Sequence, residues 1–462
     1  MRVLDPPGRA AGSFDRRLVE GPILPAVLRL SWPATLQQLL LGFQGAMSHV
    51  IAGHTVGYEA NAAIGIGWQI FLVVLVFVSS LYVGMGILVA RLAGAGDRAG
   101  VDRIVHQGLL AFVYAGLVVI PAAGWLLAPW LLDLVHAAPA VRPQALAYLR
   151  IMFGLGAGSL IVFMLGGALR AAGDAMTPFR LALLLTVLNV LLSAILIPGI
   201  GPLPALGAPG AAVATVVAGG ITAIVGLRLI ASGRYAVRLP ARWSWRLEWP
   251  ALGQVLRLGV PAGLQAVATA AAGALFIALV GSVASGAQAQ AAYVIVHVQL
   301  FAIVTWPALG LMAAASIVTG QNLGAHRRDR ARQGVLAAAG LGVIVAAVAS
   351  SAFLGAPAFL LGVFGLRDPT AVALASELLR YLSAASAFVV AGLVFTGGLQ
   401  GAGDTMVPLL ISVGSLIVLP LAWCGLIGWD GIVSADVWTA MTIGYATRGI
   451  LMAWRFQRKL AG

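Results

Sequence analysis

Long apolar stretches recur along this chain of 462 residues and constrain its fold more than any other feature. A helix needs about 20 apolar residues to cross about 30 Å of hydrocarbon, because each residue adds about 1.5 Å. Strands of a membrane barrel would be about ten residues long and would alternate in polarity, which these stretches do not. We therefore predict an all-α integral membrane protein with twelve transmembrane helices. The predicted spans are 26–50, 62–90, 104–128, 144–167, 178–198, 208–230, 252–280, 290–318, 334–356, 372–398, 408–427 and 434–454.

The composition excludes an ordinary soluble domain. Hydrophobic residues make up 61% of the chain and charged residues only 9%, whereas about a quarter of a soluble domain is charged. The formal charge of +13 would suggest nucleic acid in a soluble protein, but here the cations lie between apolar stretches. The single cysteine, Cys424, excludes a disulfide framework and a cysteine-based metal site. We expect no cofactor, metal or nucleic acid, and the lipid bilayer as the surroundings.

Basic residues fall almost entirely on one side of the predicted topology. With the N-terminus inside, the inner segments hold nearly all of them, and the outer loops hold only Arg142 and Arg367. This is the positive-inside pattern, which a miscount by one span would scramble. Heavy use of Ala, Gly and Arg is typical of a GC-rich prokaryotic genome. We therefore expect a multi-pass protein of the bacterial inner membrane with both termini in the cytoplasm.

The two halves of the chain repeat each other. LRLSWPATLQ at 28–37 matches LRLGVPAGLQ at 256–265 with an offset of 228, and LRAAGDAMTP at 169–178 matches LQGAGDTMVP at 399–408 with an offset of 230. Each half therefore holds six spans, and an even number leaves both halves in the same orientation. Parallel halves related by an axis along the membrane normal enclose a central cleft in many secondary transporters.

This repeat predicts two pseudo-symmetric six-helix lobes. The predicted divisions are a cytoplasmic tail at 1–24, an N-terminal lobe at 25–231, a cytoplasmic linker at 232–250, a C-terminal lobe at 251–455 and a cytoplasmic tail at 456–462. The linker carries three tryptophans among arginines. It either lies along the lipid headgroups or forms an exposed basic loop.

Each half also carries one Gly-Asp-x-Met-x-Pro corner. The glycine permits a tight turn, the aspartate can accept hydrogen bonds from the free amides of the next helix, and the proline suits that helix's first turn. A purely structural corner and an added part in gating are both open. The corner residues are Gly173, Asp174 and Pro178 in one half and Gly403, Asp404 and Pro408 in the other.

Polar residues form single-faced stripes on the first and fifth spans, because they recur at three-, four- and seven-residue spacings. Such groups turn away from lipid, which would leave their hydrogen bonds unmade. They either bond between helices or line a cavity of the N-terminal lobe. The stripes consist of Gln37, Gln44 and Ser48 and of Thr186, Asn189 and Ser193. Gln265 occupies the place of Gln37 in the second half.

At these motifs the chain resembles the multidrug and toxic compound extrusion (MATE) transporters of the MOP superfamily, in particular their prokaryotic DinF-like subgroup. The resemblance rests on the repeated corner, on SIVTGQNLGAHRRDRAR at 316–332 and on LNVLLSAILIPGIGPLPALGAPGAAVAT at 188–215. It extends from about Leu24 to the final span. The resemblance implies a V-shaped pair of lobes, alternating access, and export of amphipathic, often cationic, organic compounds in exchange for Na⁺ or H⁺.

The chain departs from the family at the cation site that the resemblance implies. Ser48 and Ser193 stand where aspartates are usual, while Asn189 and Thr215 match the pattern. Neutral oxygens do not easily offset the cost of desolvating a bare Na⁺. We therefore expect a transporter that exports amphipathic, cationic compounds and favours H⁺ over Na⁺.

Titratable and basic residues inside the spans leave two further questions open. No Asp or Glu lies at the middle of a predicted span, so His297 and His49 are the candidates for proton exchange, with simple packing as the alternative. Arg150 and Arg380 occupy corresponding places in the two halves. They either extend to the outer interface or place positive charge near the cleft, which would favour anionic cargo.

Three rival functions are weaker. A flippase or exporter of a lipid-linked or polar metabolite belongs to the same superfamily. A membrane-embedded enzyme is disfavoured, because the spans hold no paired carboxylates, no His-x-x-x-His pair and no nucleophile beside a base. An ion channel lacks support from a repeated filter loop. We expect small organic substrates and a monomer.

Overall fold

The computed structural model consists of helices and short connections. It describes residues 14–200, 204–238, 243–283, 285–428 and 431–461, with the backbone alone at 73–77. The first half of the chain forms α1 (Arg17–Glu20), α2 (Ile23–Thr55), α3 (Tyr58–Ala95), α4 (Arg98–Tyr114), η2 (Ala115–Val119), α5 (Ile120–Leu134), α6 (Arg142–Leu155), α7 (Ala157–Ala171), α8 (Met176–Leu196) and α9 (Ala208–Ala231). The second half forms α10 (Trp249–Gly281), α11 (Gly286–Tyr293), η3 (Val294–Leu300), α12 (Ala302–Gly324), α13 (Arg328–Gly355), α14 (Pro357–Val363), α15 (Pro369–Gly401), α16 (Met406–Val413), η4 (Gly414–Val418), α17 (Leu419–Ile427) and α18 (Ser434–Ala461). The three η segments are π-helical.

Each of the twelve predicted spans corresponds to a helix or to a run of consecutive helices. Nine helical segments among the described residues are long and apolar enough to cross a membrane, and α6 with α7 makes a tenth across a bend of 54°. The remaining two spans are α2 and α18, which are 33 and 28 residues long and carry more polar residues. The prediction of an all-α protein with twelve membrane-length helices is confirmed.

The fourth span is broken at a glycine. α6 ends at Leu155 and α7 begins at Ala157. A Cβ added to Gly156, between them, would lie 2.2 Å from the carbonyl oxygen of Met152, so only glycine fits this turn. The equivalent position in the second half, Ser386, lies inside the continuous helix α15. The break is therefore a property of one half only.

The chain divides into two compact units. The first contains Leu36–Val260, and the second contains Arg16–Thr35 together with the chain from Pro261 onward. α2 and α10 are therefore each divided between the units, next to the prolines Pro33 and Pro261 that the repeat places at equivalent positions. These limits differ from the lobe boundaries that the repeat predicts at 231 and 251, and those boundaries stay a prediction.

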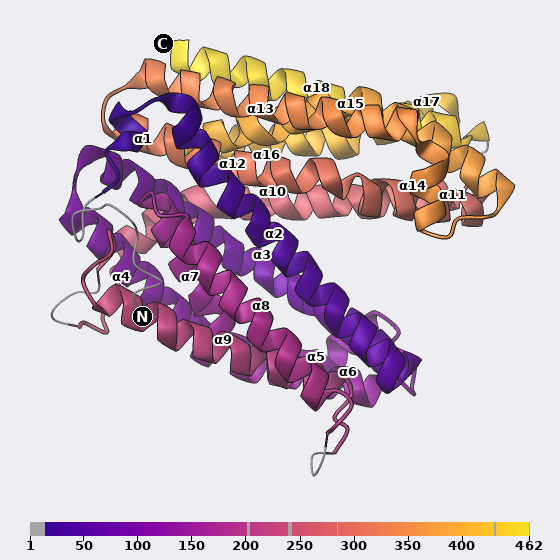
Figure 1. The fold of residues 1–462 in the computed structure, drawn as a ribbon, viewed down its shortest axis with the longest axis horizontal. Coiled ribbons are helices and arrows are strands. Elements are labelled where there is room, and N and C mark those ends of the chain that lie inside the picture. Colours follow the sequence, from indigo (N-terminus) through magenta and orange to yellow (C-terminus); the bar gives the residue numbers. More distant parts are fainter. Residues whose placement is uncertain (1–13, 201–203, 239–242, 284, 429–430, 462) are drawn as a thin grey trace. The chain divides into compact units, whose positions relative to one another are not determined.

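Within each unit, long helices pack along their lengths. In the first unit α9 contacts α7 and α8, and α3 contacts α4, α6 and α7 (Figure 1). Its apolar core includes Met85, Phe112 and Met164 in one cluster and Phe71 and Phe153 in another. In the second unit α15 contacts α12, α13 and α18, and α1 packs on α12.

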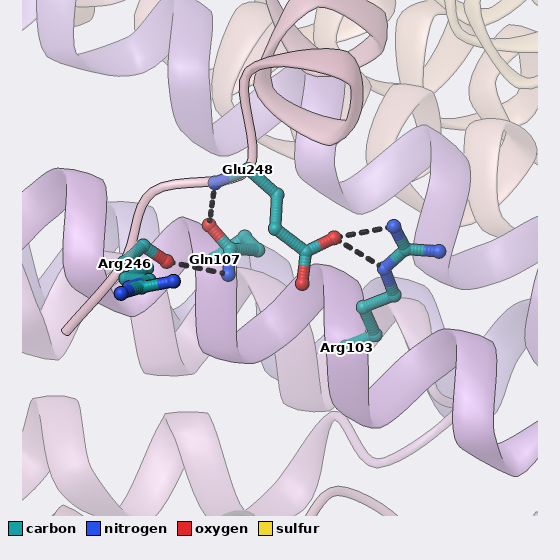
Figure 2. Close-up of polar contacts among 4 residues, drawn as sticks. All are labelled: Arg103, Gln107, Arg246 and Glu248. Carbon is teal, nitrogen blue, oxygen red and sulfur yellow. Dashed lines mark hydrogen bonds and ion pairs between the residues drawn. The ribbon is translucent and has the colours of Figure 1, made fainter. Parts of the chain in front are cut away.

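The linker predicted at 232–250 lies against α4 in its described part (Figure 2). The Gln107 side chain binds the linker backbone twice, because its Nε2 donates to Arg246 O at 3.2 Å and its Oε1 accepts from Glu248 N at 2.8 Å. Arg103 adds an ion pair with the Glu248 carboxylate. The linker is thus hydrogen-bonded to the first unit. Its predicted surroundings, headgroups or water, stay open.

α3 and the first turns of α10 meet backbone to backbone at two glycines. A Cβ added to Gly84 would lie 2.0 Å from Val255 O, and one added to Gly259 would lie 1.8 Å from Ser80 O. Small residues allow such close approach, which matters in lipid because packing rather than the hydrophobic effect holds helices together there. This contact therefore tolerates no larger side chain.

We expect Gly84→Ala to lower the thermal unfolding midpoint of the detergent-solubilised protein, because forcing an extra methyl group into a packed contact costs about 1–3 kcal/mol. Gly86→Ala is the matched control on the same helix, since no atom lies within 4 Å of its added Cβ. Size-exclusion chromatography of heated samples measures both midpoints. Equal midpoints for the two variants would contradict the contact.

Candidate functional site

A cavity of about 350 Å³ lies inside the first unit. Side chains from α2, α3, α6, α7, α8 and α9 line it. Much of the lining is apolar and includes the aromatic rings of Trp68, Phe71 and Phe163. Pockets of about 300–1,000 Å³ with apolar walls and a few polar groups are typical sites for small organic ligands.

Three of the predicted cavity residues line this space: Gln37, Gln44 and Thr215. The Nε2 of Gln37 donates to Pro178 O at 2.9 Å, which ties α2 to the first turn of α8. The Oε1 of Gln44 is buried and has no donor among the described residues. Ser48 donates to Gln44 O on its own helix at 3.2 Å and does not belong to the lining.

The polar stripe of α8 lies behind the cavity wall. Asn189 Nδ2 donates to Thr215 Oγ1 at 3.0 Å. Thr215 lines the cavity and Asn189 does not, so Asn189 is connected to the cavity by this hydrogen bond. Asn189 Oδ1 and the hydroxyls of Thr186 and Ser193 are buried without a partner among the described residues. The structure thus joins Asn189 to Thr215 and leaves Thr186 and Ser193 outside the lining.

The charged side chain in the cavity wall is Arg170, one of the basic residues that the positive-inside pattern places in the inner segments. It lies in the last turn of α7, and its guanidinium donates to Gln37 Oε1 and, at 3.3 Å, to Tyr82 OH. None of the described lining residues is acidic. Nor do the described residues contain a group of three His, Cys, Asp or Glu side chains that could hold a metal.

The second unit repeats the Arg170–Gln37 contact without its charge. Gln265 takes the place of Gln37, and Gln400 takes the place of Arg170. Gln400 Nε2 donates to Gln265 Oε1 at 3.2 Å, while Gln265 Nε2 donates to Ser412 Oγ at 3.0 Å. Gln265 is 4% exposed, so it is buried in this hydrogen-bonded set. An alignment of the two halves, which pairs Gln37 with Gln265 and Arg170 with Gln400, would have indicated Arg170.

Both candidate histidines have hydrogen-bond partners. His297 lies in η3, where its Nε2 is 2.8 Å from Tyr445 OH and its ring stacks on those of Tyr293 and Phe301. His49 Nδ1 is 2.5 Å from Asn61 Oδ1. These contacts fit packing residues, and a proton role for either histidine stays a proposal.

The two intramembrane arginines do not supply the positive charge of the cavity. The guanidinium of Arg150 lies 4.6 Å from the centre of the Trp125 ring, in a cation–π contact outside the lining. Arg380, in the other unit, is exposed. The positive charge in the wall comes from Arg170 instead.

The two corners share one backbone. Gly173 and Gly403 have φ of 94° and 73°, in the left-handed region that glycine adopts without strain. Pro178 and Pro408 lie in the first turns of α8 and α16, where a missing N–H does no harm. The geometry expected for a structural corner is therefore present in both halves.

The corner aspartates differ in their partners. Asp174 accepts from the Thr177 amide at 3.1 Å and from the Thr177 hydroxyl at 2.7 Å. Asp404 accepts weakly from the Val407 amide at 3.4 Å and forms an ion pair with Arg455, whose Nη2 lies 2.7 Å from Asp404 Oδ2. The corner at Asp174 is thus stabilised by a hydrogen bond from a hydroxyl, and the corner at Asp404 by an ion pair.

The sequence model of the MatE family matches the chain twice, over residues 33–195 and 261–424. The chain belongs to the MATE family. The "Probable multidrug resistance protein NorM" of Rhizobium meliloti (strain 1021) is a MATE relative that is 30% identical over 453 residues, covering 93% of this chain and 95% of the relative. The protein of the same name from Deinococcus radiodurans is 30% identical over 450 residues, covering 94% of this chain and 95% of its own length.

Solved MATE structures have the same fold. One, described as the outward-facing conformation of a multidrug resistance MATE family transporter, has a TM-score of 0.87 at 21% identity and covers 98% of this chain and 99% of its own. A MOP superfamily transporter from Pyrococcus furiosus, described as having a binding pocket of reverse polarity, has a TM-score of 0.86 at 21% identity and covers 96% of this chain and 97% of its own. The predicted family membership is confirmed, and the chain is a multi-span membrane protein.

We expect Arg455→Gln to destabilise the protein, because it leaves the Asp404 carboxylate, 8% exposed, without its counter-charge. The cost should be about 1–2 kcal/mol, below that of a fully buried pair, since the Arg455 side chain is 33% exposed. Thermal unfolding measures the loss, and Lys459→Gln is the control for removing one cation from the same helix. Adding Asp404→Asn to Arg455→Gln should restore part of the lost stability. If the effects of the two substitutions simply add, the ion pair between Asp404 and Arg455 is contradicted.

Proposed function

We propose that this MATE-family chain exports amphipathic organic compounds by alternating access, driven by an ion gradient. The single observation that carries the proposal is the cavity of about 350 Å³, whose lining is largely apolar and includes aromatic rings. Such a lining accepts many compounds of similar size without strict hydrogen-bond demands. The names of its relatives, probable multidrug resistance proteins, support the same function.

For the coupling ion we propose H⁺ rather than Na⁺. The described cavity lining holds no carboxylate, and Ser48 and Ser193 stand where the family resemblance implies aspartates. The Asn189–Thr215 pair offers only neutral oxygens, which offset the desolvation of Na⁺ poorly. His297, hydrogen-bonded to Tyr445, is our candidate for proton exchange.

For cargo we propose amphiphiles that include organic cations, because the faces of Trp68, Phe71 and Phe163 can hold a cation by cation–π contact. A second candidate function is the flipping or export of a lipid-linked or polar metabolite. The positively charged Arg170 in the cavity wall is the observation that favours it.

We place the protein in the bacterial inner membrane as a monomer with both termini in the cytoplasm. The distribution of arginines between inner and outer loops supports this orientation. The proposal includes no cofactor and no catalysed reaction.

Purified protein in liposomes should expel an ethidium-like dye when a pH gradient is imposed and respond little to a Na⁺ gradient. The reason is that the described cavity offers no carboxylate to bind Na⁺. Dye fluorescence under separately imposed gradients measures both responses, with protein-free liposomes as the control. Stimulation by Na⁺ equal to that by H⁺ would refute the proposed coupling, and no export of any cationic, neutral or anionic compound in a test panel would refute the transporter.

The double variant Ser48→Asp with Ser193→Asp should acquire a Na⁺ response. It restores carboxylates at the two positions that the family resemblance marks, which would compensate the charge of the ion. The control is Ser48→Asn with Ser193→Asn, which adds similar volume without charge. Dye export under a Na⁺ gradient measures the gain. A folded Asp variant that remains indifferent to Na⁺ would show that these positions are not a cation site.

A further inference from the structure

Arg170 is held in the cavity wall with donors to spare. Its guanidinium has five N–H groups; Nη1 donates to Gln37 Oε1 and Nη2 donates to Tyr82 OH. Both partners are neutral, so neither balances the charge. A planar fork of donors pre-oriented by two neighbouring side chains is well suited to bind two oxygens of one acidic group.

The nearest carboxylate in the sequence does not compensate this charge. Asp174, four residues further on, is 4% exposed and accepts from the Thr177 amide and hydroxyl. Arg170 forms no ion pair with any of the described residues. None of the described residues that line the cavity is acidic. Since a charge in an apolar cavity is costly when unpaired, an anionic ligand would interact strongly there.

The second half of the chain shows that the bridge between helices does not require a charge. There Gln400 makes the same contact to Gln265 with a neutral amide, within the same repeated framework. An amide in place of Arg170 would serve the packing between the first span and the corner helix. Packing between the first span and the corner helix therefore does not account for the charge of Arg170.

We propose that Arg170 is a specificity-determining residue that binds the acidic group of an amphiphilic cargo, such as a carboxylate, sulfonate or phosphate. This inference rests on the proposed export function and adds to its substrates amphiphiles with an acidic group, alone or as zwitterions. Gln44 Oε1, a buried acceptor in the same lining, lies seven residues from Gln37, or about 10 Å along the helix. It can accept from an amine at the other end of a zwitterion.

Dansyl-phenylalanine and its amide form a matched probe pair, because they share one aromatic body and differ by a single negative charge. Their fluorescence is followed as they bind the full-length protein in nanodiscs of zwitterionic lipid. The wild type should bind the acid about tenfold or more tightly than the amide, as expected for a charge-assisted pair. Equal affinity for acid and amide in the wild type would overturn the proposal without any variant.

Arg170→Gln, which copies Gln400, should remove this preference and tighten the binding of ethidium, a cation. Arg228→Gln is the matched control, since Arg228 is exposed and does not belong to this lining. Gln37→Glu gives a second variant, because the new carboxylate would form an ion pair with Arg170. It should weaken binding of the acid probe and leave binding of the amide probe unchanged. Retained preference in folded Arg170→Gln, or the same loss in Arg228→Gln, would overturn the proposal.

Two further measurements complete the test. The first distinguishes a lipid headgroup from free cargo as the source of the acidic group, and the second distinguishes failure of this proposal from failure of the export proposal. If phosphatidylglycerol in the nanodisc competes with the acid probe only when Arg170 is present, the bound group is a lipid headgroup; if it does not, the group belongs to free cargo. If liposomes export ethidium and the amide while the wild type binds acid and amide equally, the exporter stands and the anion subsite falls. If acid is preferred but nothing is exported, the subsite stands and the exporter falls.

Discussion

Hydrocarbon offers no hydrogen-bond partner to a polar group, and the rest of this structure depends on that constraint. Backbone amides are hydrogen-bonded within long helices, and several polar side chains form hydrogen bonds between helices. Gln37 and Gln265 illustrate the rule, because each bonds through both its oxygen and its nitrogen to neighbouring helices. The unpartnered Oε1 of Gln44 lines a cavity instead, whereas the hydroxyls of Thr186 and Ser193 are buried outside that lining without a partner among the described residues.

Much of the fold could be predicted because length and apolarity are properties of single segments. The twelve spans and both glycine corners required only local reasoning about helix length, left-handed turns and helix capping. The break at Gly156 was not predicted, because glycines such as Gly392 also lie inside a continuous helix, α15. The π-helical turns were not predicted either. Lobe boundaries, termini and coupling chemistry stay predictions, because they depend on interactions beyond one segment.

The candidate site was predicted only in part. Gln37 and Gln44 were found because polar residues on an apolar helix must face inward, and Thr215 was found through the family resemblance. Arg170 was missed because an arginine near a helix end satisfies the positive-inside pattern, and that pattern is blind to where a long side chain points. The hydrogen bond from Arg170 to Gln37 shows instead that this side chain belongs to the cavity wall.

The division of α2 between the two compact units affects how the protein is made. Residues 16–35 leave the ribosome before the segments they pack against, which begin at Pro261, so the intervening chain must be translated in between. At about 5–20 residues per second, that interval is on the order of tens of seconds. The second unit therefore cannot be completed one half at a time during synthesis, and its opening segment must wait in the membrane, available to insertion machinery or quality control.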